Sequence, residues 1–131
     1  MSCHVASHWV LLVANLKEKI WDFYDSMPNP THKTPLRCAD EVLQEDTCDV
    51  LPSDIALWPL RVVEGVPTQD NGNDCGIFVM KYMAASLVEG PVDWSSQKDW
   101  GKDMPRIRAE MVASFCRIFQ SSLLTEYGFK F

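Results

Sequence analysis

The chain has 131 residues, 47% of them hydrophobic and 23% charged, which suits one modest globular domain and excludes an intrinsically disordered chain. Its formal net charge is -6 and its basic residues form no cluster, which disfavours binding to nucleic acid or to an anionic membrane surface. The longest apolar run, Trp9–Ala14, is too short to span a bilayer, and the segment Met1–His4 lacks the features of a secretory signal.

The five cysteines are odd in number and form no C-x-x-C pair. This pattern indicates free thiols in a reducing compartment rather than the disulfide framework of a secreted protein. Cys3, His4 and His8 are neighbours in the sequence, but no second ligand pair follows at the spacing of a zinc finger. We therefore expect no zinc site.

The first elements in chain order predict an antiparallel hairpin. Trp9–Ala14 is a continuous apolar run rich in β-forming residues, which is typical of a strand buried on both faces. A second strand is expected over Ile20–Tyr24, after a turn at 15–19 and before the polar break at 25–28.

The register of this hairpin decides whether two polar residues at its open end meet. A four-residue loop with Ala14 opposite Lys19 places His8 opposite Asp25, with Cβ atoms about 5 Å apart. An aspartate so placed orients the imidazole and stabilises its charged form. The alternative is that both residues merely end their strands, as polar residues often do.

The middle of the chain is less regular. A Pro-rich loop over 29–35 precedes a candidate short helix over Cys38–Glu45 and then an irregular acidic stretch. In that stretch Leu57 and Trp58 are expected to pack as a hydrophobic plug. Leu60–Val66 predicts a further strand.

A polar, Gly-rich segment, Gln69–Gly76, leads directly into an apolar helical pattern that begins at Cys75. The first N–H groups of a helix are unpaired and that end is partly positive, so a thiol there is stabilised as the nucleophilic thiolate. Asp74 stands at the cap position, while Gly72 and Gly76 leave room for a tight turn and for another chain to approach. The alternative is a capped helix whose cysteine is structural.

Two helices are expected in the C-terminal half. The first runs from Cys75 to about Val88, is apolar nearly all round and therefore buried, and stops at Glu89-Gly90-Pro91. The second has Asp103 as its cap and Pro105 in its first turn. Its apolar residues at helical spacing predict a packing face: Ile107, Met111, Phe115, Ile118 and Phe119.

Several short motifs occur in a fixed order along the chain: His8-Trp9, Tyr24-Asp25-Ser26, Gln69, Asn71-Gly72-x-Asp74-Cys75-Gly76 and Asp103-Met104-Pro105-Arg106-x-Arg108. This order resembles the ubiquitin-like-protein-specific cysteine proteases, the SUMO (sentrin-specific) protease family, from about His8 to about Ile118. The resemblance implies part of a papain-like α+β fold, with a small antiparallel or mixed sheet packed on helices and a buried helix that starts at Cys75.

The resemblance also implies roles for individual residues. Cys75 would be the nucleophile, His8 the general base and acid, Asp25 the residue that orients His8, and Gln69 an oxyanion donor beside the backbone N–H of Cys75. Trp9 is similar to the tryptophan that helps to confine the substrate's Gly-Gly tail. The remaining substrate-binding positions implied by the motif are Gly72, Asp74 and Gly76.

The implied reaction is acyl transfer, in which the Cys75 thiolate attacks the carbonyl after a C-terminal Gly-Gly and water releases the thioester. It requires no metal or cofactor. The implied partners are SUMO or another ubiquitin-like protein and its conjugates, with no nucleic acid and no membrane. The nucleus or the cytoplasm is the location that the resemblance implies.

One departure from the family pattern concerns the region before His8. Family domains carry a substantial helical and loop region there, which forms part of the substrate groove and supplies a second tryptophan, whereas seven residues precede His8 here. We therefore expect residues 1–131 to form a single, N-terminally truncated catalytic domain. Two functions stay open: an active deconjugating or processing protease, and a catalytically weak or inactive truncated or transposon-related remnant that acts at most as a ubiquitin-like-protein binding module. An uncovered apolar face would favour self-association.

Overall fold

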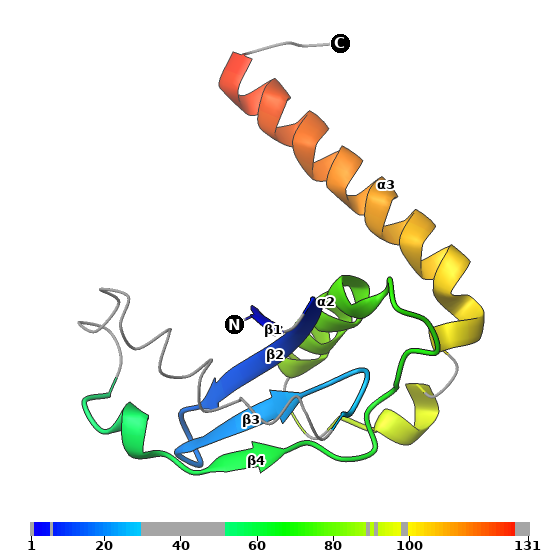
Figure 1. Cartoon of the computed structure of the whole chain (residues 1–131). Helices are drawn as coiled ribbons and strands as arrows, with labels where there is room; N and C mark the ends of the chain where they lie inside the picture. The colour runs from blue at the N-terminus through cyan, green and yellow to red at the C-terminus, as the bar shows by residue number, and fades with distance from the viewer. Residues whose placement is uncertain are drawn as a thin grey trace. The chain divides into compact units, whose positions relative to one another are not determined.

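The computed structural model describes residues 2–5, 7–29, 52–88, 90, 92–97 and 100–127 of the chain (Figure 1). It contains two compact units, Met1–Lys98 and Asp99–Phe131. The helix predicted over Cys38–Glu45 lies outside the described residues. None of the described helices is long and apolar enough to cross a membrane.

The first unit is built on a four-stranded mixed sheet, so the predicted α+β class is confirmed. The antiparallel neighbours β1 (Ser2–Val5), β2 (His8–Asn15) and β3 (Ile20–Tyr24) are followed by β4 (Leu60–Val62), which pairs parallel with β3. Both strands of the predicted hairpin are present. β1 was not predicted, because a segment of four residues is too short to show a period. The strand expected over Leu60–Val66 is wrong in length, since β4 ends at Val62.

The register of the β2–β3 hairpin differs from the predicted one. Ala14 pairs with Trp21 and not with Lys19, because the four-residue loop begins one residue later, at Leu16. Asn15 therefore stays in β2, where its side-chain oxygen accepts a hydrogen bond of 3.1 Å from a loop N–H. Lys19 takes a left-handed conformation, with φ of 54°, and turns the chain back. The register is displaced by two residues as a result.

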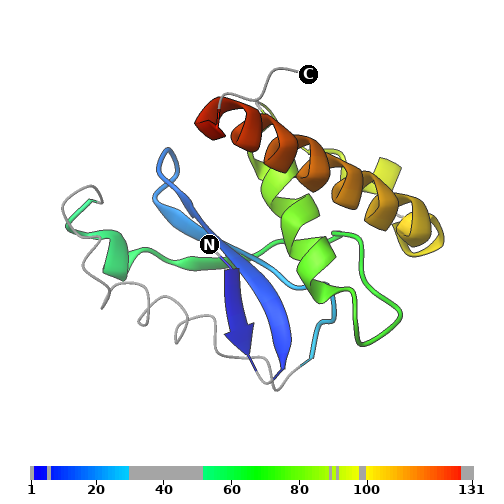
Figure 2. The same ribbon diagram turned by 90° about the horizontal axis from the view of Figure 1, so that it is seen from above.

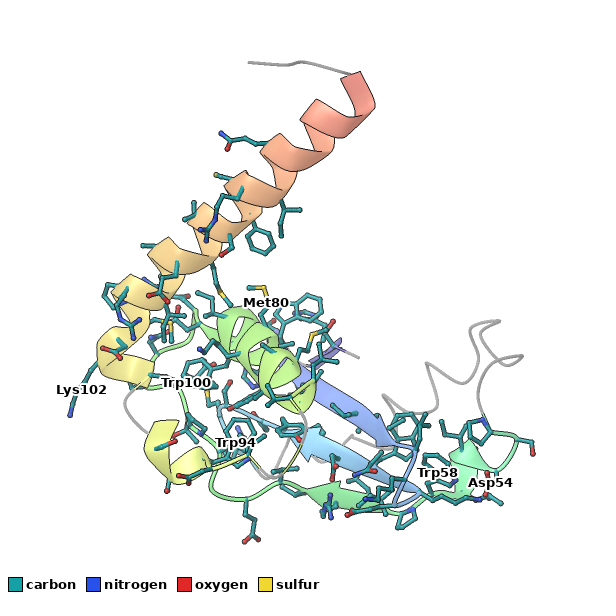
Figure 3. All side chains as sticks on the ribbon, turned by 180° about the vertical axis from the view of Figure 1, so that it is seen from behind. Asp54, Trp58, Met80, Trp94, Trp100 and Lys102 are labelled. Carbon is teal, nitrogen blue, oxygen red and sulfur yellow. The ribbon has the colours of Figure 1, made fainter. Side chains whose placement is uncertain are left out.

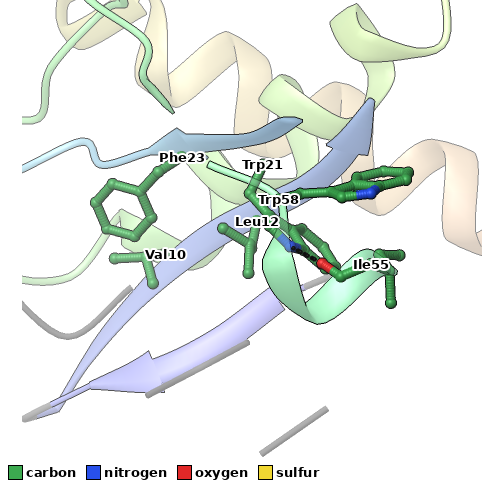
Figure 4. Packing of buried hydrophobic residues seen from close by; sticks show 6 residues of the cluster. All are labelled: Val10, Leu12, Trp21, Phe23, Ile55 and Trp58. Atoms are coloured by element: carbon green, nitrogen blue, oxygen red, sulfur yellow. Dashed lines mark hydrogen bonds between the residues drawn. The ribbon is translucent and has the colours of Figure 1, made fainter. Parts of the chain in front are cut away.

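The main hydrophobic cluster lies between one face of the sheet and the short 3-10 helix η2 (Ile55–Leu57). Alternation along β2 and β3 places every second side chain in it. Trp21 Nε1–H donates to the backbone oxygen of Ile55 at 3.0 Å and fastens η2 to the sheet (Figure 4). Figure 4 shows the members of this cluster: Val10, Leu12, Trp21, Phe23, Ile55 and Trp58.

The prediction that Leu57 and Trp58 pack together in the core is confirmed for Trp58 and wrong for Leu57. Trp58 is buried, but Leu57 is 85% exposed and Ile55 fills the core in its place. Figure 3 shows Asp54 and Trp58 flanking η2, at its start and its end.

Helix α2 (Cys75–Ser86) packs on the sheet against β2 (Figures 1 and 2). Its predicted start at Cys75 is confirmed, and it ends two residues before the expected Val88. Its buried residues are Cys75, Phe78, Val79 and Tyr82, whereas Met83 is 42% exposed. The expectation that the helix is buried all round is therefore wrong, because only the side toward the sheet is covered.

An aromatic cluster fixes α2 on the sheet. The ring of Tyr82 lies 5.5 Å from that of Tyr24 on β3 and 5.8 Å from that of Trp94, in the 3-10 helix η3 (Trp94–Gln97). The Tyr82 hydroxyl donates to the backbone oxygen of Pro67 at 2.5 Å. Burial raises the pKa of Tyr82 well above its ordinary value, and the charge of Asp25 adds to the rise. The hydroxyl therefore stays protonated and holds the chain that leads to Gln69.

The second unit contains α3 (Trp100–Tyr127). This helix begins three residues before Asp103, so the predicted cap residue lies in the first turn, where its charge suits the helix dipole. Arg106 bridges Asp103 at 2.9 Å and Glu110 at 2.6 Å, which ties the turns around Pro105 together. The predicted packing stripe is exposed at Phe115, by 57%, and at Ile118, by 63%. The side chain of Phe119 lies outside the described part of the chain.

Candidate active site

His8 and Asp25 form a buried pair. His8 Nε2 lies 2.8 Å from Asp25 Oδ1, and the two residues are 4% and 7% exposed. The predicted hydrogen bond is confirmed, although the register behind it is wrong. The β2–β3 pairing ends at Leu11–Tyr24, and the two side chains meet beyond it. Because Nε2 faces the carboxylate, it carries the proton of a neutral ring, and Nδ1 is then the basic nitrogen.

The same carboxylate oxygen shapes the turn after β3. Asp25 Oδ1 also accepts the backbone N–H of Met27 at 2.8 Å, which closes a tight turn around Ser26. An oxygen that receives two donors has little freedom to rotate. The turn therefore fixes the orientation of the carboxylate toward His8.

Ser26 links this turn to Gln69 by two hydrogen bonds. The Ser26 hydroxyl donates to Gln69 Oε1 at 2.7 Å, and the Ser26 backbone oxygen accepts the Gln69 N–H at 2.7 Å. Gln69 Nε2 in turn donates to the backbone oxygen of Asn71 at 2.5 Å. Ser26 is 1% exposed. No role was predicted for it, although it stands in the Tyr24-Asp25-Ser26 motif, directly after Asp25.

The segment between Gln69 and the helix is held by side chains of its own. Asn71 Nδ2 donates to Asp74 Oδ2 at 2.7 Å, and Asn71 Oδ1 accepts the N–H of Asn73 at 2.9 Å. Asp74 occupies the predicted cap position, but its side chain makes no capping hydrogen bond. Its backbone oxygen receives the N–H groups of Ile77 and Phe78 instead. The predicted cap position is confirmed, while the Asp74 carboxylate accepts a hydrogen bond from Asn71.

Cys75 is the first residue of α2 and carries a free thiol. The residue is 7% exposed. It comes directly after the segment that Gln69 begins, and α2 packs against β2, the strand that starts at His8. The elements that carry the predicted nucleophile, base and oxyanion donor are therefore neighbours in the first unit (Figure 2).

The predicted substrate-binding glycines have open space around them. Neither Gly72 nor Gly76 has a positive φ, and a Cβ atom added to either would meet no atom of the chain within 4 Å. The turn itself does not require glycine at these positions. The approach of another chain remains the physical reason that we offer for them.

Trp9 is available at the surface. Its side chain is 43% exposed, and its ring lies 4.8 Å from the ring of His4 on β1. Asp74, in contrast, is 1% exposed, so it shapes the loop from within.

Residues 3–123 match the model of the Ulp1 protease family, C-terminal catalytic domain. The chain belongs to this family. It is 29% identical over 113 residues to human sentrin-specific protease 5, an alignment that covers 86% of this chain and 14% of that protein.

Two further relatives agree with this family. Over 84 residues the chain is 33% identical to ubiquitin-like-specific protease 1A of Arabidopsis thaliana, covering 61% of this chain and 16% of that protein. Over 113 residues it is 29% identical to human sentrin-specific protease 2, covering 83% and 18%. The chain spans less than a fifth of the length of each of these three relatives.

Proposed function

We propose that this chain is a thiol-dependent peptidase and isopeptidase that cleaves after the C-terminal Gly-Gly of SUMO or of a related ubiquitin-like modifier. The observation that carries the proposal is the buried 2.8 Å hydrogen bond between His8 Nε2 and Asp25 Oδ1. It leaves Nδ1 as the basic nitrogen, as cysteine-protease chemistry needs. Membership of the Ulp1 protease family supports the choice of substrate class.

The reaction begins with transfer of the Cys75 thiol proton to His8 Nδ1. The thiolate then attacks the carbonyl carbon after the Gly-Gly, and a C–S bond forms. His8 returns the proton to the leaving amine as the C–N bond breaks. Water, deprotonated by His8, attacks the thioester, releases the modifier's carboxylate and restores the thiol.

The oxyanion formed in both halves of the reaction is stabilised by two donors. Gln69 Nε2 carries two N–H groups, of which one is used by the backbone oxygen of Asn71, so the other is assigned to the oxyanion. The backbone N–H of Cys75 is the second donor, at the positive end of α2. Loss of one such donor typically lowers kcat by about 10² to 10³.

The substrate tail is assigned to Trp9, Gly72 and Gly76, with Asp74 holding the loop in shape. A flat aromatic side chain that is 43% exposed and two glycines with open space suit a tail without side chains. Selection of Gly-Gly would follow from steric exclusion of larger residues.

The test is a SUMO protein whose C-terminal Gly-Gly ends in a thiol-reactive group. The expected result is a covalent adduct on Cys75, which is lost in Cys75→Ala and formed more slowly in His8→Ala. Cys116→Ala, which removes the exposed free thiol on α3, is the matched control and should label like the unmodified chain. An adduct on Cys116 in place of Cys75 would contradict the proposal, as would equal labelling by a probe that lacks Gly-Gly.

The second candidate is a catalytically weak or inactive chain that binds a ubiquitin-like protein. The observation that favours it is burial, since His8 and Cys75 are only 4% and 7% exposed. A saturable binding isotherm between Cys75→Ala and SUMO, together with no adduct on the unmodified chain, would select this candidate.

We further propose self-association through exposed apolar side chains of α3, where Val112, Phe115 and Ile118 are each more than half exposed. Light scattering should then report a mass above that of one chain. Phe115→Glu should reduce it, and a monomer at all concentrations would contradict the idea. We also propose that the protein acts in a reducing compartment, the nucleus or the cytoplasm.

A further inference from the structure

We propose that Ser26 is a positioning residue for Gln69, and that the turn from Asp25 to Met27 aligns the general base and the oxyanion donor together. The inference rests on the roles that the proposed function gives to His8 and Gln69. It adds a residue to which no role was assigned, and it makes a prediction about coupling between residues.

The hydrogen bonds fix which way the Gln69 amide faces. The backbone oxygen of Asn71 only accepts, so the amide nitrogen must be the atom on that side, at 2.5 Å. The amide oxygen then faces Ser26, whose hydroxyl donates to it at 2.7 Å. Because the amide is planar, these two contacts fix the direction of its second N–H.

Burial makes the Ser26 hydroxyl hard to replace by water. Ser26 is 1% exposed and Gln69 is 9% exposed. When the hydroxyl is removed, Oε1 loses this donor and the amide is held from the Asn71 side alone. The donor is then less well oriented, and orientation toward the developing oxyanion is what an oxyanion donor contributes.

The turn joins the two halves of the site through consecutive residues. Asp25 Oδ1 accepts both His8 Nε2–H and the N–H of Met27, each at 2.8 Å. The Met27 bond closes the turn that contains Ser26. The Ser26 backbone oxygen also accepts the Gln69 N–H, at 2.7 Å. The backbone link survives a change of the Ser26 side chain, so the side chain can be tested without removing the turn.

The kinetic test uses the full chain and a SUMO Gly-Gly substrate with a fluorescent leaving group. In Ser26→Ala, kcat should fall about tenfold, with KM little changed. This loss is smaller than the roughly 10²- to 10³-fold fall in kcat expected for Gln69→Ala, because the amide donor is misoriented rather than removed. The double variant should be no slower than Gln69→Ala alone, because a residue that acts through another has no effect once that residue is gone. Ser26→Thr, which keeps a hydroxyl, should restore part of kcat.

Ser86→Ala is the matched control. Ser86 lies on α2, and its hydroxyl donates to the Tyr82 backbone oxygen at 2.8 Å, so this variant also removes one hydroxyl from the first unit. It should leave kcat unchanged and should remain additive with Gln69→Ala.

A second measurement does not depend on turnover. In nitrogen-15 NMR spectra, the two side-chain N–H signals of Gln69 should be well separated and should exchange slowly with water. Ser26→Ala should move them toward the values of a free glutamine and speed their exchange, whereas Ser86→Ala should not.

The outcomes separate this inference from the proposed function. If Gln69→Ala lowers kcat but Ser26→Ala does not, or if the two effects multiply in the double variant, the inference is wrong and the enzyme remains. If no adduct forms on Cys75, the proposed function fails, and the NMR signals alone decide whether Ser26 positions Gln69. Unchanged Gln69 signals in Ser26→Ala would overturn the inference in either case.

Discussion

Asp25→Asn tests how the turn after β3 controls the imidazole. Asparagine keeps an oxygen acceptor but loses the charge, so its effect depends on which way its amide faces. If the nitrogen faced His8, it would donate to the ring and impose the wrong tautomer, a fault that costs about 10⁴ in kcat in a catalytic triad. If the oxygen faces His8, only the charge is lost.

The structure predicts that the oxygen stays in place. Asp25 Oδ1 accepts the N–H of Met27 as well as His8 Nε2–H, both at 2.8 Å. A backbone N–H cannot accept a hydrogen bond, so the amide nitrogen of the variant is excluded from that position. A hydrogen bond to a charged acceptor such as the Asp25 carboxylate contributes about 1.5 to 3 kcal/mol, and a hydrogen bond to a neutral acceptor such as the asparagine oxygen contributes about 0.5 to 1.5 kcal/mol. The difference, about 1 to 1.5 kcal/mol, corresponds to about a tenfold loss of rate.

The assay is kcat/KM for a SUMO Gly-Gly substrate with a fluorescent leaving group. Asp25→Asn should lose about tenfold, while Asp25→Ala also deprives the buried His8 ring and the part-buried Met27 N–H of their acceptor and should unfold more easily by about 1 to 3 kcal/mol. Asp93→Asn is the control, because the Asp93 carboxylate also accepts a backbone N–H, from Ser95 at 3.0 Å, but on an exposed loop. A loss near 10⁴ in Asp25→Asn would refute the argument that Met27 holds the oxygen, and no loss would refute a role for the charge.

Three other predictions follow from the geometry. Iodoacetamide at about pH 6.5 should label Cys75 faster than the exposed Cys116, although Cys75 is only 7% exposed, because a cysteine at a helix start is placed to react as the nucleophile. Tyr82→Phe should lower the free energy of unfolding by about 1 kcal/mol at neutral pH, and the difference from the unmodified chain should shrink above about pH 10, measured by urea unfolding. Arg61→Gln should destabilise the fold by about 1 to 2 kcal/mol, because it leaves the buried Asp22 carboxylate without its paired guanidinium.

Each of these has its own control. Faster labelling of Cys116 than of Cys75 would argue against thiolate activation. The direction of the pH effect for Tyr82 follows from its raised pKa, because the folded protein holds the hydroxyl proton more tightly than the unfolded chain does. The contribution of Tyr82 to the free energy of unfolding is therefore complete below about pH 10, the pKa of tyrosine in the unfolded chain, and is lost as the pH rises. A gap that widens with pH would contradict it. Lys19→Gln breaks an exposed ion pair of 3.0 Å and should change stability less than Arg61→Gln.

The elements with strong local patterns were predictable from the sequence. β3 has its predicted bounds, and α2 begins at the predicted residue, Cys75, because an apolar period of two or of 3.6 shows directly in the sequence. The hairpin register was not predictable to the residue. A loop of four residues fits at two neighbouring positions, and the choice depends on the left-handed conformation of Lys19 and the side-chain hydrogen bond of Asn15.

The core and the cap show a different limit. Ile55 belongs to the hydrophobic cluster and Leu57 does not, since the path of a 3-10 helix decides which of two apolar neighbours faces the sheet. Asp74 stands at a cap position, but its carboxylate accepts a hydrogen bond from Asn71 and makes no capping hydrogen bond. Local propensity identified the right positions here, and tertiary contacts decided what each side chain does.

The His8–Asp25 contact was predicted from a wrong register and is nevertheless present, because it lies beyond the paired strands and hydrogen bonds outside them hold it. His8 and Asp25 meet beyond the last β2–β3 pair, and the carboxylate is aimed by the N–H of Met27 rather than by a cross-strand partner. Ser26 then carries the same turn to Gln69. The alignment of base and oxyanion donor therefore depends on one three-residue turn rather than on the pairing of β2 with β3. For this reason we expect substitutions in that turn to affect activity more than substitutions in the paired part of the two strands, Leu11–Asn15 and Ile20–Tyr24.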